Sequence, residues 1–125
     1  MAEMNPVNWF EIPAADLARA TAFYEALFEV KLEANELGDL KMSMFPMAQA
    51  APGAAGALVQ SPNHQPATAG TTVYFFVADL DAALGRVEAG GGKVVVPRTD
   101  IGEHGYFAQF EDTEGNRVAL HTPAG

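Results

Sequence analysis

The sequence contains no cysteine among its 125 residues. Disulfide bonds, thiolate metal sites and a cysteine nucleophile are therefore excluded. The sequence also lacks an apolar stretch long enough to cross a membrane, and its N-terminus lacks a charged segment followed by an apolar run. We therefore expect a cytoplasmic protein with no membrane partner.

Basic residues are scarce and scattered along the chain. Only 7 Lys and Arg residues stand against 16 Asp and Glu residues, which gives a net charge of −9. Without a basic stripe, nucleic acids and anionic membranes are poor partners. Charged residues make up only 18% of the chain, whereas hydrophobic residues make up 49%. A small domain of this composition can cover part of its apolar surface by forming a dimer.

The first half of the sequence predicts a strand, a helix and three short strands. Residues 7–12 are rich in aromatic and β-branched side chains and end at a proline, which is typical of a strand. Asp16 is a candidate helix N-cap, because its carboxylate can accept hydrogen bonds from free backbone N–H groups. Apolar residues at helical spacing then predict a helix that ends near Phe28. The three strands are expected over 30–33, 40–45 and 57–60.

The second half repeats this order. Residues 71–77 form the most strand-like segment of the chain, and Asp79 is a second candidate N-cap. The residues around Asp79 match those around Asp16, and strand, cap, helix and following strand come in the same order. Further strands are expected over 93–96, 106–111 and 117–121.

This repeat predicts an α+β fold of two βαβββ modules, whose curved mixed sheet surrounds a cleft. We expect one domain over 1–125, with the first module at 5–61, a linker at 62–70 and the second module at 71–123. The alanine-rich connection over 46–56, which contains two prolines and two glycines, is expected to join two strands of the first module. Each module buries one face of its sheet under its own helix, so the other face is free to line the cleft.

Strand alternation predicts which side chains face the cleft. Phe10 and Ile12 are expected to face the helix, which leaves Trp9 and Glu11 for the cleft. Aromatic rings there can stack on a planar ligand, and a few polar groups can orient it. His104 lies in a glycine-flanked loop and is expected at the rim. The ligand-binding residues predicted in this way are Trp9, Glu11, Gln60, Thr72, Tyr74, Phe76, His104, Phe107, Gln109 and His121.

Three segments carry a resemblance to a known family. They are residues 9–17, the helical residues 18–24, and residues 112–116, which read Asp-Thr-Glu-Gly-Asn. The last segment is similar to an Asp-Pro-Asp-Gly-Asn turn, with Thr113 in place of proline. Together they resemble the glyoxalase/bleomycin-resistance/extradiol dioxygenase (vicinal oxygen chelate) superfamily over nearly the whole chain. The resemblance implies a glyoxalase-like fold and a homodimer.

The metal enzymes of this superfamily take one ligand from each of four strands. The matching positions here hold Trp9, Thr72, Ala119 and a residue near Leu58. These side chains cannot hold a divalent ion together. We therefore expect a member without the usual metal ligands and without a metal cofactor.

Three hypotheses for function remain open at this point. In the first, the protein binds a small organic molecule in its cleft without the usual metal. In the second, it is a lyase, isomerase or dioxygenase that uses a divalent metal at a displaced site formed by Glu11 and His121. In the third, its own aromatic side chains close the cleft, and the protein is a non-catalytic interaction module. The sequence leaves open whether any reaction is catalysed.

Overall fold

The computed structural model describes residues 5–48 and 51–125. Residues 1–4 of the predicted domain, and residues 49 and 50 of the predicted connection, lie outside the described residues. The first module contains β1 (Trp9–Pro13), α1 (Leu17–Phe28), β2 (Glu33–Leu37), β3 (Leu40–Met44) and β4 (Ala55–Gln60). The second contains β5 (Tyr74–Phe76), α2 (Leu80–Ala89), β6 (Lys93–Asp100), β7 (Tyr106–Glu111) and β8 (Arg117–Thr122). Neither α-helix in this part of the chain is long and apolar enough to cross a membrane.

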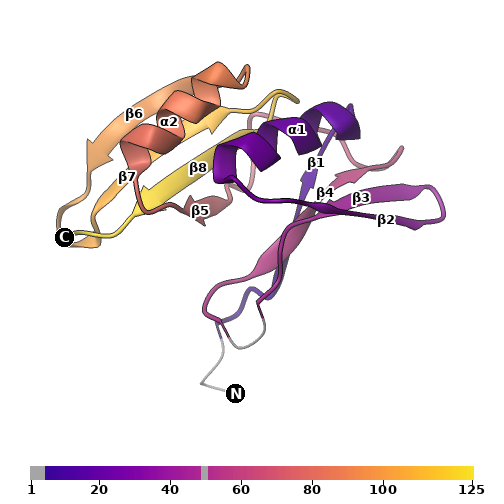
Figure 1. The fold of residues 1–125 in the computed structure, drawn as a ribbon, viewed down its shortest axis with the longest axis horizontal. Coiled ribbons are helices and arrows are strands. Elements are labelled where there is room, and N and C mark those ends of the chain that lie inside the picture. The colour runs from indigo at the N-terminus through magenta and orange to yellow at the C-terminus, as the bar shows by residue number, and fades with distance from the viewer. Residues whose placement is uncertain (1–4, 49–50) are drawn as a thin grey trace.

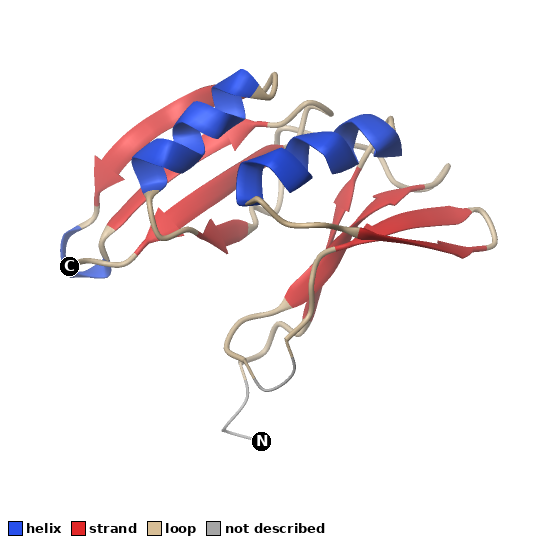
Figure 2. Ribbon diagram, in the orientation of Figure 1, coloured by secondary structure: helices blue, strands red, loops and turns tan. Residues whose placement is uncertain are grey.

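Each module forms its own four-stranded mixed sheet (Figure 2). The strand orders are β1-β4-β3-β2 and β5-β8-β7-β6, so the second module repeats the first strand for strand. In each sheet the first and last strands of the module pair in parallel, and the other neighbours are antiparallel. The predicted α+β fold of two βαβββ modules is confirmed. Strands β1 and β5 each form one edge of their sheet.

The two helices begin in the same way, as the repeat predicted. The Asp16 carboxylate accepts a hydrogen bond from the Arg19 backbone N–H at 3.1 Å. The Asp79 carboxylate accepts one from the Ala82 N–H, also at 3.1 Å. Both N-cap predictions are thus confirmed. Helix α1 ends at Phe28, as expected.

Most strands lie within two residues of their predicted bounds, and three differ by more. The strand expected over 30–33 is β2, which begins later because residues 30–32 are still bound to the end of α1 through Glu25. The strand expected over 71–77 is shorter, with only 74–76 in regular structure. Conversely, β6 continues through Pro97 to Asp100. Proline is tolerated there because β6 is an edge strand with a register shift near this residue.

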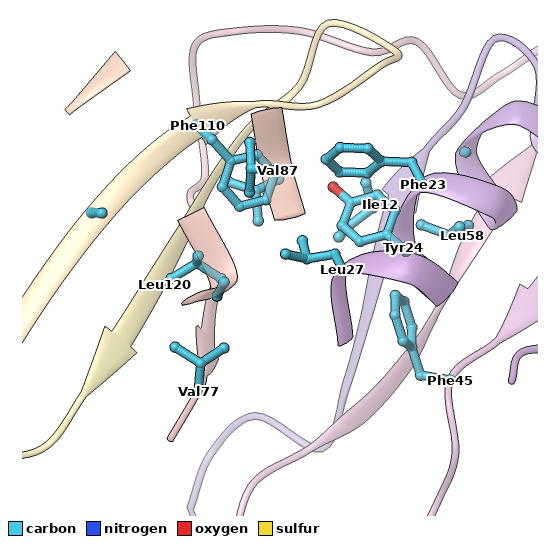
Figure 3. Close-up of a cluster of buried hydrophobic side chains, with 14 of the residues drawn as sticks. Ile12, Phe23, Tyr24, Leu27, Phe45, Leu58, Val77, Val87, Phe110 and Leu120 are labelled. Carbon is cyan, nitrogen blue, oxygen red and sulfur yellow. The ribbon is translucent and has the colours of Figure 1, made fainter. Parts of the chain in front are cut away.

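Both modules share one hydrophobic core. Helices α1 and α2 lie side by side, each above its own sheet (Figure 1). The core contains side chains from both modules, which include Ile12, Tyr24, Leu58, Val87 and Phe110 (Figure 3). Burial of this apolar area is the main contribution to the stability of the domain.

Four phenylalanines pack together where the edge strands β1 and β5 of the two modules meet. Phe75 of β5 packs against Phe10 with ring centroids 5.3 Å apart. It also packs against Phe28 at 4.6 Å and Phe45 at 5.5 Å. We call Phe10, Phe28, Phe45 and Phe75 the aromatic seam. Edge-to-face and tilted ring pairs of this kind stabilise beyond their buried area.

The turn between β7 and β8, residues 112–116, binds the first module through polar contacts. The buried Tyr24 hydroxyl donates to Asp112 Oδ2 at 2.7 Å. Asn116 Nδ2 donates to the Pro13 carbonyl oxygen, also at 2.7 Å. Burial, and then the negative charge of Asp112, raise the pKa of Tyr24 well above its ordinary value, so the hydroxyl keeps its proton and remains a donor. The family-like turn is therefore a connection between the modules.

Glu114 completes this connection. Its carboxylate accepts the Asp16 backbone N–H at 2.8 Å and two hydrogen bonds from the Arg19 guanidinium at 2.7 and 3.0 Å. Burial by itself raises the pKa of Glu114, but the hydrogen bonds from Arg19, Asp16 and Thr113 outweigh it and lower the pKa to about 2. Because this pKa lies below the ordinary value of 4.5, the ionised side chain stabilises the fold.

We expect Glu114→Gln to lower the free energy of unfolding by about 1–2 kcal/mol at pH 7, a figure reduced for the solvent exposure of Arg19. The contribution is complete above pH 4.5, and it is lost as the pH falls towards about 2. Urea unfolding at several pH values measures this difference. Glu36→Gln, on the exposed strand β2, is the control and should change little. A Glu114→Gln deficit that stays constant down to pH 2 would contradict the assignment.

Candidate functional site

A cavity of about 750 Å³ lies between β1 and β5, along the line where the two modules meet. We call it the inter-module cavity. Its volume falls within the range of small-molecule sites. The described residues that line it are Asn5, Val7, Trp9, Phe10, Glu11, Pro52, Gly53, Ala54, Thr71, Thr72, Val73, Tyr74, Phe75 and Phe76.

Three aromatic side chains form the exposed part of the cavity wall. Relative exposures are 36% for Trp9, 53% for Tyr74 and 68% for Phe76. Large aromatic side chains on a free surface leave apolar area in water, which a ligand or another chain can cover. On the same β1 strand Ile12 is buried in the core and Phe10 packs against it, as alternation predicted.

Glu11 is held by a short series of polar contacts. The Trp9 indole Nε1–H donates to Glu11 Oε2 at 3.3 Å. Glu11 Oε1 lies 3.5 Å from His64 Nε2, and His64 Nδ1 lies 2.7 Å from the Ser61 hydroxyl. These contacts fix the carboxylate at the cavity wall. The linker around His64 has no hydrophobic periodicity, so the sequence gives no signal that this residue meets β1.

The structure brings five of the ten predicted site residues to the inter-module cavity, namely Trp9, Glu11, Thr72, Tyr74 and Phe76. Three others lie on the same sheet: His121 of β8 pairs with Phe76 of β5, and Phe107 and Gln109 lie on β7, the strand after β8 in the sheet order. The Phe107 ring lies 6.3 Å from the Tyr74 ring, and Gln109 Nε2 donates to the Tyr74 hydroxyl at 3.4 Å. These two residues therefore support a cavity residue without lining the cavity.

The remaining predicted residues take other positions. Gln60 Oε1 accepts the Leu17 backbone N–H at 2.7 Å, and this residue lines a separate cavity of about 390 Å³ beside the N-terminus of α1. His121 Nε2 lies 2.6 Å from the His104 carbonyl oxygen, while the His104 side chain is exposed. The structure thus pairs Glu11 with His64 rather than with the predicted partner His121.

The donor groups do not fit a metal centre of the family's kind. Within residues 5–48 and 51–125, no group of three or more His, Cys, Asp or Glu side chains lies close enough to hold a metal ion. Catalytic metal sites need at least three protein ligands in most enzymes. The hydrogen bond from Trp9 and the neighbouring His64 are the contacts that the Glu11 carboxylate has instead.

The comparisons with known proteins agree with this fold. Residues 7–120 match the family model of the Glyoxalase/Bleomycin resistance protein/Dioxygenase superfamily. The chain belongs to this superfamily. The resemblance inferred from the three segments is thereby confirmed, and the match covers both modules.

Relatives within the superfamily carry several descriptions. A glyoxylase-like domain-containing protein of Didymella fabae is 34% identical over 95% of this chain and 94% of its own length. The anthracycline biosynthesis protein DnrV of Streptomyces peucetius is 30% identical over 90% of this chain, which spans only 45% of that protein. The solved structure of TnmS3, an antibiotic-binding protein of Streptomyces sp. CB03234, aligns with a TM-score of 0.70 at 21% identity. It covers 97% of this chain and 98% of its own, and at this identity it shows the fold alone.

Proposed function

We propose that this superfamily member binds a small organic molecule with a planar aromatic part in the inter-module cavity, without the usual metal. The observation that carries the proposal is the exposed aromatic wall of Trp9, Tyr74 and Phe76 around a cavity of about 750 Å³. Flat rings stack favourably on such side chains. The open volume is the reason to prefer this role to that of an interaction module with a closed cleft.

The polar groups of the cavity support the same role. Thr71 and Thr72 add hydroxyl groups, and Glu11 adds one oriented carboxylate. A largely apolar pocket with a few fixed polar groups is the usual composition of a small-molecule site. A relative described as an anthracycline biosynthesis protein makes polycyclic aromatic compounds the first class to test.

Tyr74→Ala and Phe76→Ala should each weaken the binding of an aromatic ligand about tenfold, the effect of losing about 1–1.5 kcal/mol of ring contact. Both side chains are more than half exposed, so the thermal midpoint should change little. Calorimetric titration with a panel of naphthalene and anthraquinone derivatives measures the affinity. Titration in the presence of a chelator should give the same affinity.

A control variant separates ring contact from general damage. Leu37→Ala removes an equally exposed apolar side chain on β2, away from the cavity, and should leave affinity unchanged. If Tyr74→Ala and Phe76→Ala bind like the native protein, the cavity is not the site. If the chelator abolishes binding, the metal-dependent hypothesis replaces this proposal.

We also propose that the chain forms a homodimer. Only 18% of the residues are charged and 49% are hydrophobic, and a small domain of this composition can cover apolar surface outside the cavity by pairing with a second copy. Sedimentation velocity should give a species of twice the chain's mass, and a monomer at every concentration tested would contradict the proposal.

A further inference from the structure

The charge on the described wall of the inter-module cavity is negative only. Of the described residues that line it, Glu11 alone is charged, and the others are apolar or neutral polar. The chain as a whole carries a net charge of −9. A carboxylate at an apolar wall needs a compensating partner when a ligand removes its water. A field of this sign also attracts cations to the cavity from a distance.

The Glu11 carboxylate is positioned to receive such a partner. Its Oε2 atom is held by the Trp9 indole N–H at 3.3 Å, while its side chain keeps 37% of its surface exposed. The ring of Trp9 and that of Tyr74 line the same cavity. Aromatic faces attract cations in addition to stacking on planar groups. The Glu11 carboxylate and the aromatic faces therefore both favour a ligand that carries a positive charge.

We propose that the cavity selects aromatic molecules that carry a protonated amine. The ring system packs against Trp9, Tyr74 and Phe76, and the ammonium group donates to Glu11. This inference rests on the proposed function, and it adds the charge class of the ligand. The titratable group that faces Glu11 is His64 of the linker, whose Nε2 atom lies 3.5 Å from Glu11 Oε1. A ligand ammonium group competes with this imidazole for the carboxylate.

The test uses three probes of one shape, which are 2-naphthylmethylamine, 2-naphthylmethanol and 2-naphthoate. Calorimetry gives the affinities, and the indole ¹H–¹⁵N signal reports on the site, because Trp9 is the only tryptophan and binds Glu11 directly. We expect the amine to bind about tenfold more tightly than the alcohol, the effect of one charge-assisted hydrogen bond. The carboxylate probe should bind more weakly than the alcohol.

Glu11→Gln tests the role of the carboxylate, because glutamine keeps an acceptor for Trp9 and removes the charge. It should reduce amine affinity about tenfold, to near that of the alcohol, and reduce alcohol affinity much less, because the hydroxyl can donate to the glutamine amide oxygen as well. Glu36→Gln removes one charge from the exposed strand β2 and should change neither affinity by more than about twofold, since distant exposed charges are screened. His64→Gln removes the competing imidazole and should keep or increase the preference for the amine.

The outcomes separate this inference from the proposed function. Equal binding of amine and alcohol to the native protein would overturn the charge preference and leave aromatic binding intact. Binding of none of the three probes, with an unmoved Trp9 signal, would count against both. A loss of amine affinity in Glu36→Gln equal to that in Glu11→Gln would assign the preference to net charge and would also overturn the inference.

Discussion

Replacing Asp112 with alanine is expected to lower the free energy of unfolding by about 3–5 kcal/mol, the range for breaking a buried charged network. Asp112 is only 4% exposed, and its carboxylate accepts four hydrogen bonds. The donors are the Tyr24 hydroxyl, the backbone N–H groups of Glu114 and Asn116, and the Asn116 side chain. Alanine would leave these donors without their acceptor, and a buried donor without a partner carries its full desolvation cost.

Urea unfolding followed by circular dichroism measures this loss. Asp39→Ala, at an exposed turn of the first module, is the matched control and should stay within about 0.5 kcal/mol of the native protein. Tyr24→Phe removes a single donor and should cost about 1–2 kcal/mol. If Asp112→Ala were as mild as Asp39→Ala, the turn would not connect the modules energetically.

The second large effect is expected at Gly56 on β4, which lies opposite Phe10 in the β1–β4 ladder. A Cβ added there would lie 2.6 Å from two ring carbons of Phe10 and still closer to the Phe10 carbonyl oxygen. Because backbone cannot move aside as a side-chain end can, Gly56→Ala should destabilise by about 3 kcal/mol, at the upper end for overpacking. It should also shift Phe10, which belongs to the aromatic seam and lines the inter-module cavity.

Gly85 provides the matched control for this substitution. It lies within helix α2, and beyond the backbone of that helix an added Cβ would have no described atom within 4 Å. Gly85→Ala should therefore stabilise by about 0.5–1 kcal/mol, because alanine loses less backbone entropy in a helix. Thermal unfolding of both variants shows whether each substitution lowers or raises the stability. A neutral Gly56→Ala would show that β1 and β4 can separate to admit a methyl group.

The predictable parts of the fold and of the site are those that depend on neighbours in sequence. Asp16 and Asp79 act within one helical turn, so each could be identified as an N-cap from the sequence. Alternation along β1 and β5 likewise predicted from neighbouring residues that Trp9, Glu11 and Tyr74 face away from the helices. Four of the residues expected in the cleft, Trp9, Glu11, Tyr74 and Phe76, lie on these two strands and line the inter-module cavity, and Thr72 lines it from just before β5. Phe10 and Phe75, which were expected on the helix side, line it as well.

The contacts that the sequence did not reveal join residues far apart along the chain. Glu11 meets His64 because a linker without periodicity folds back onto β1. Gln60 was expected in the cleft, but its amide oxygen binds the N-terminus of α1. Glu114 was part of a family-like turn, and only the structure shows that it binds Arg19. Spacing within one strand or helix carries no information about such partners.

The 112–116 turn also sets the order in which a newly synthesised chain can complete its fold. Asp112 lies 88 residues after Tyr24, and Asn116 lies 103 residues after Pro13. A ribosome releases the chain from the N-terminal side, so the first module emerges long before the turn that supplies these partners. Until then the Tyr24 hydroxyl and the half of the core on α1 are uncovered. The first module therefore exposes this apolar face for as long as the second half of the chain takes to emerge.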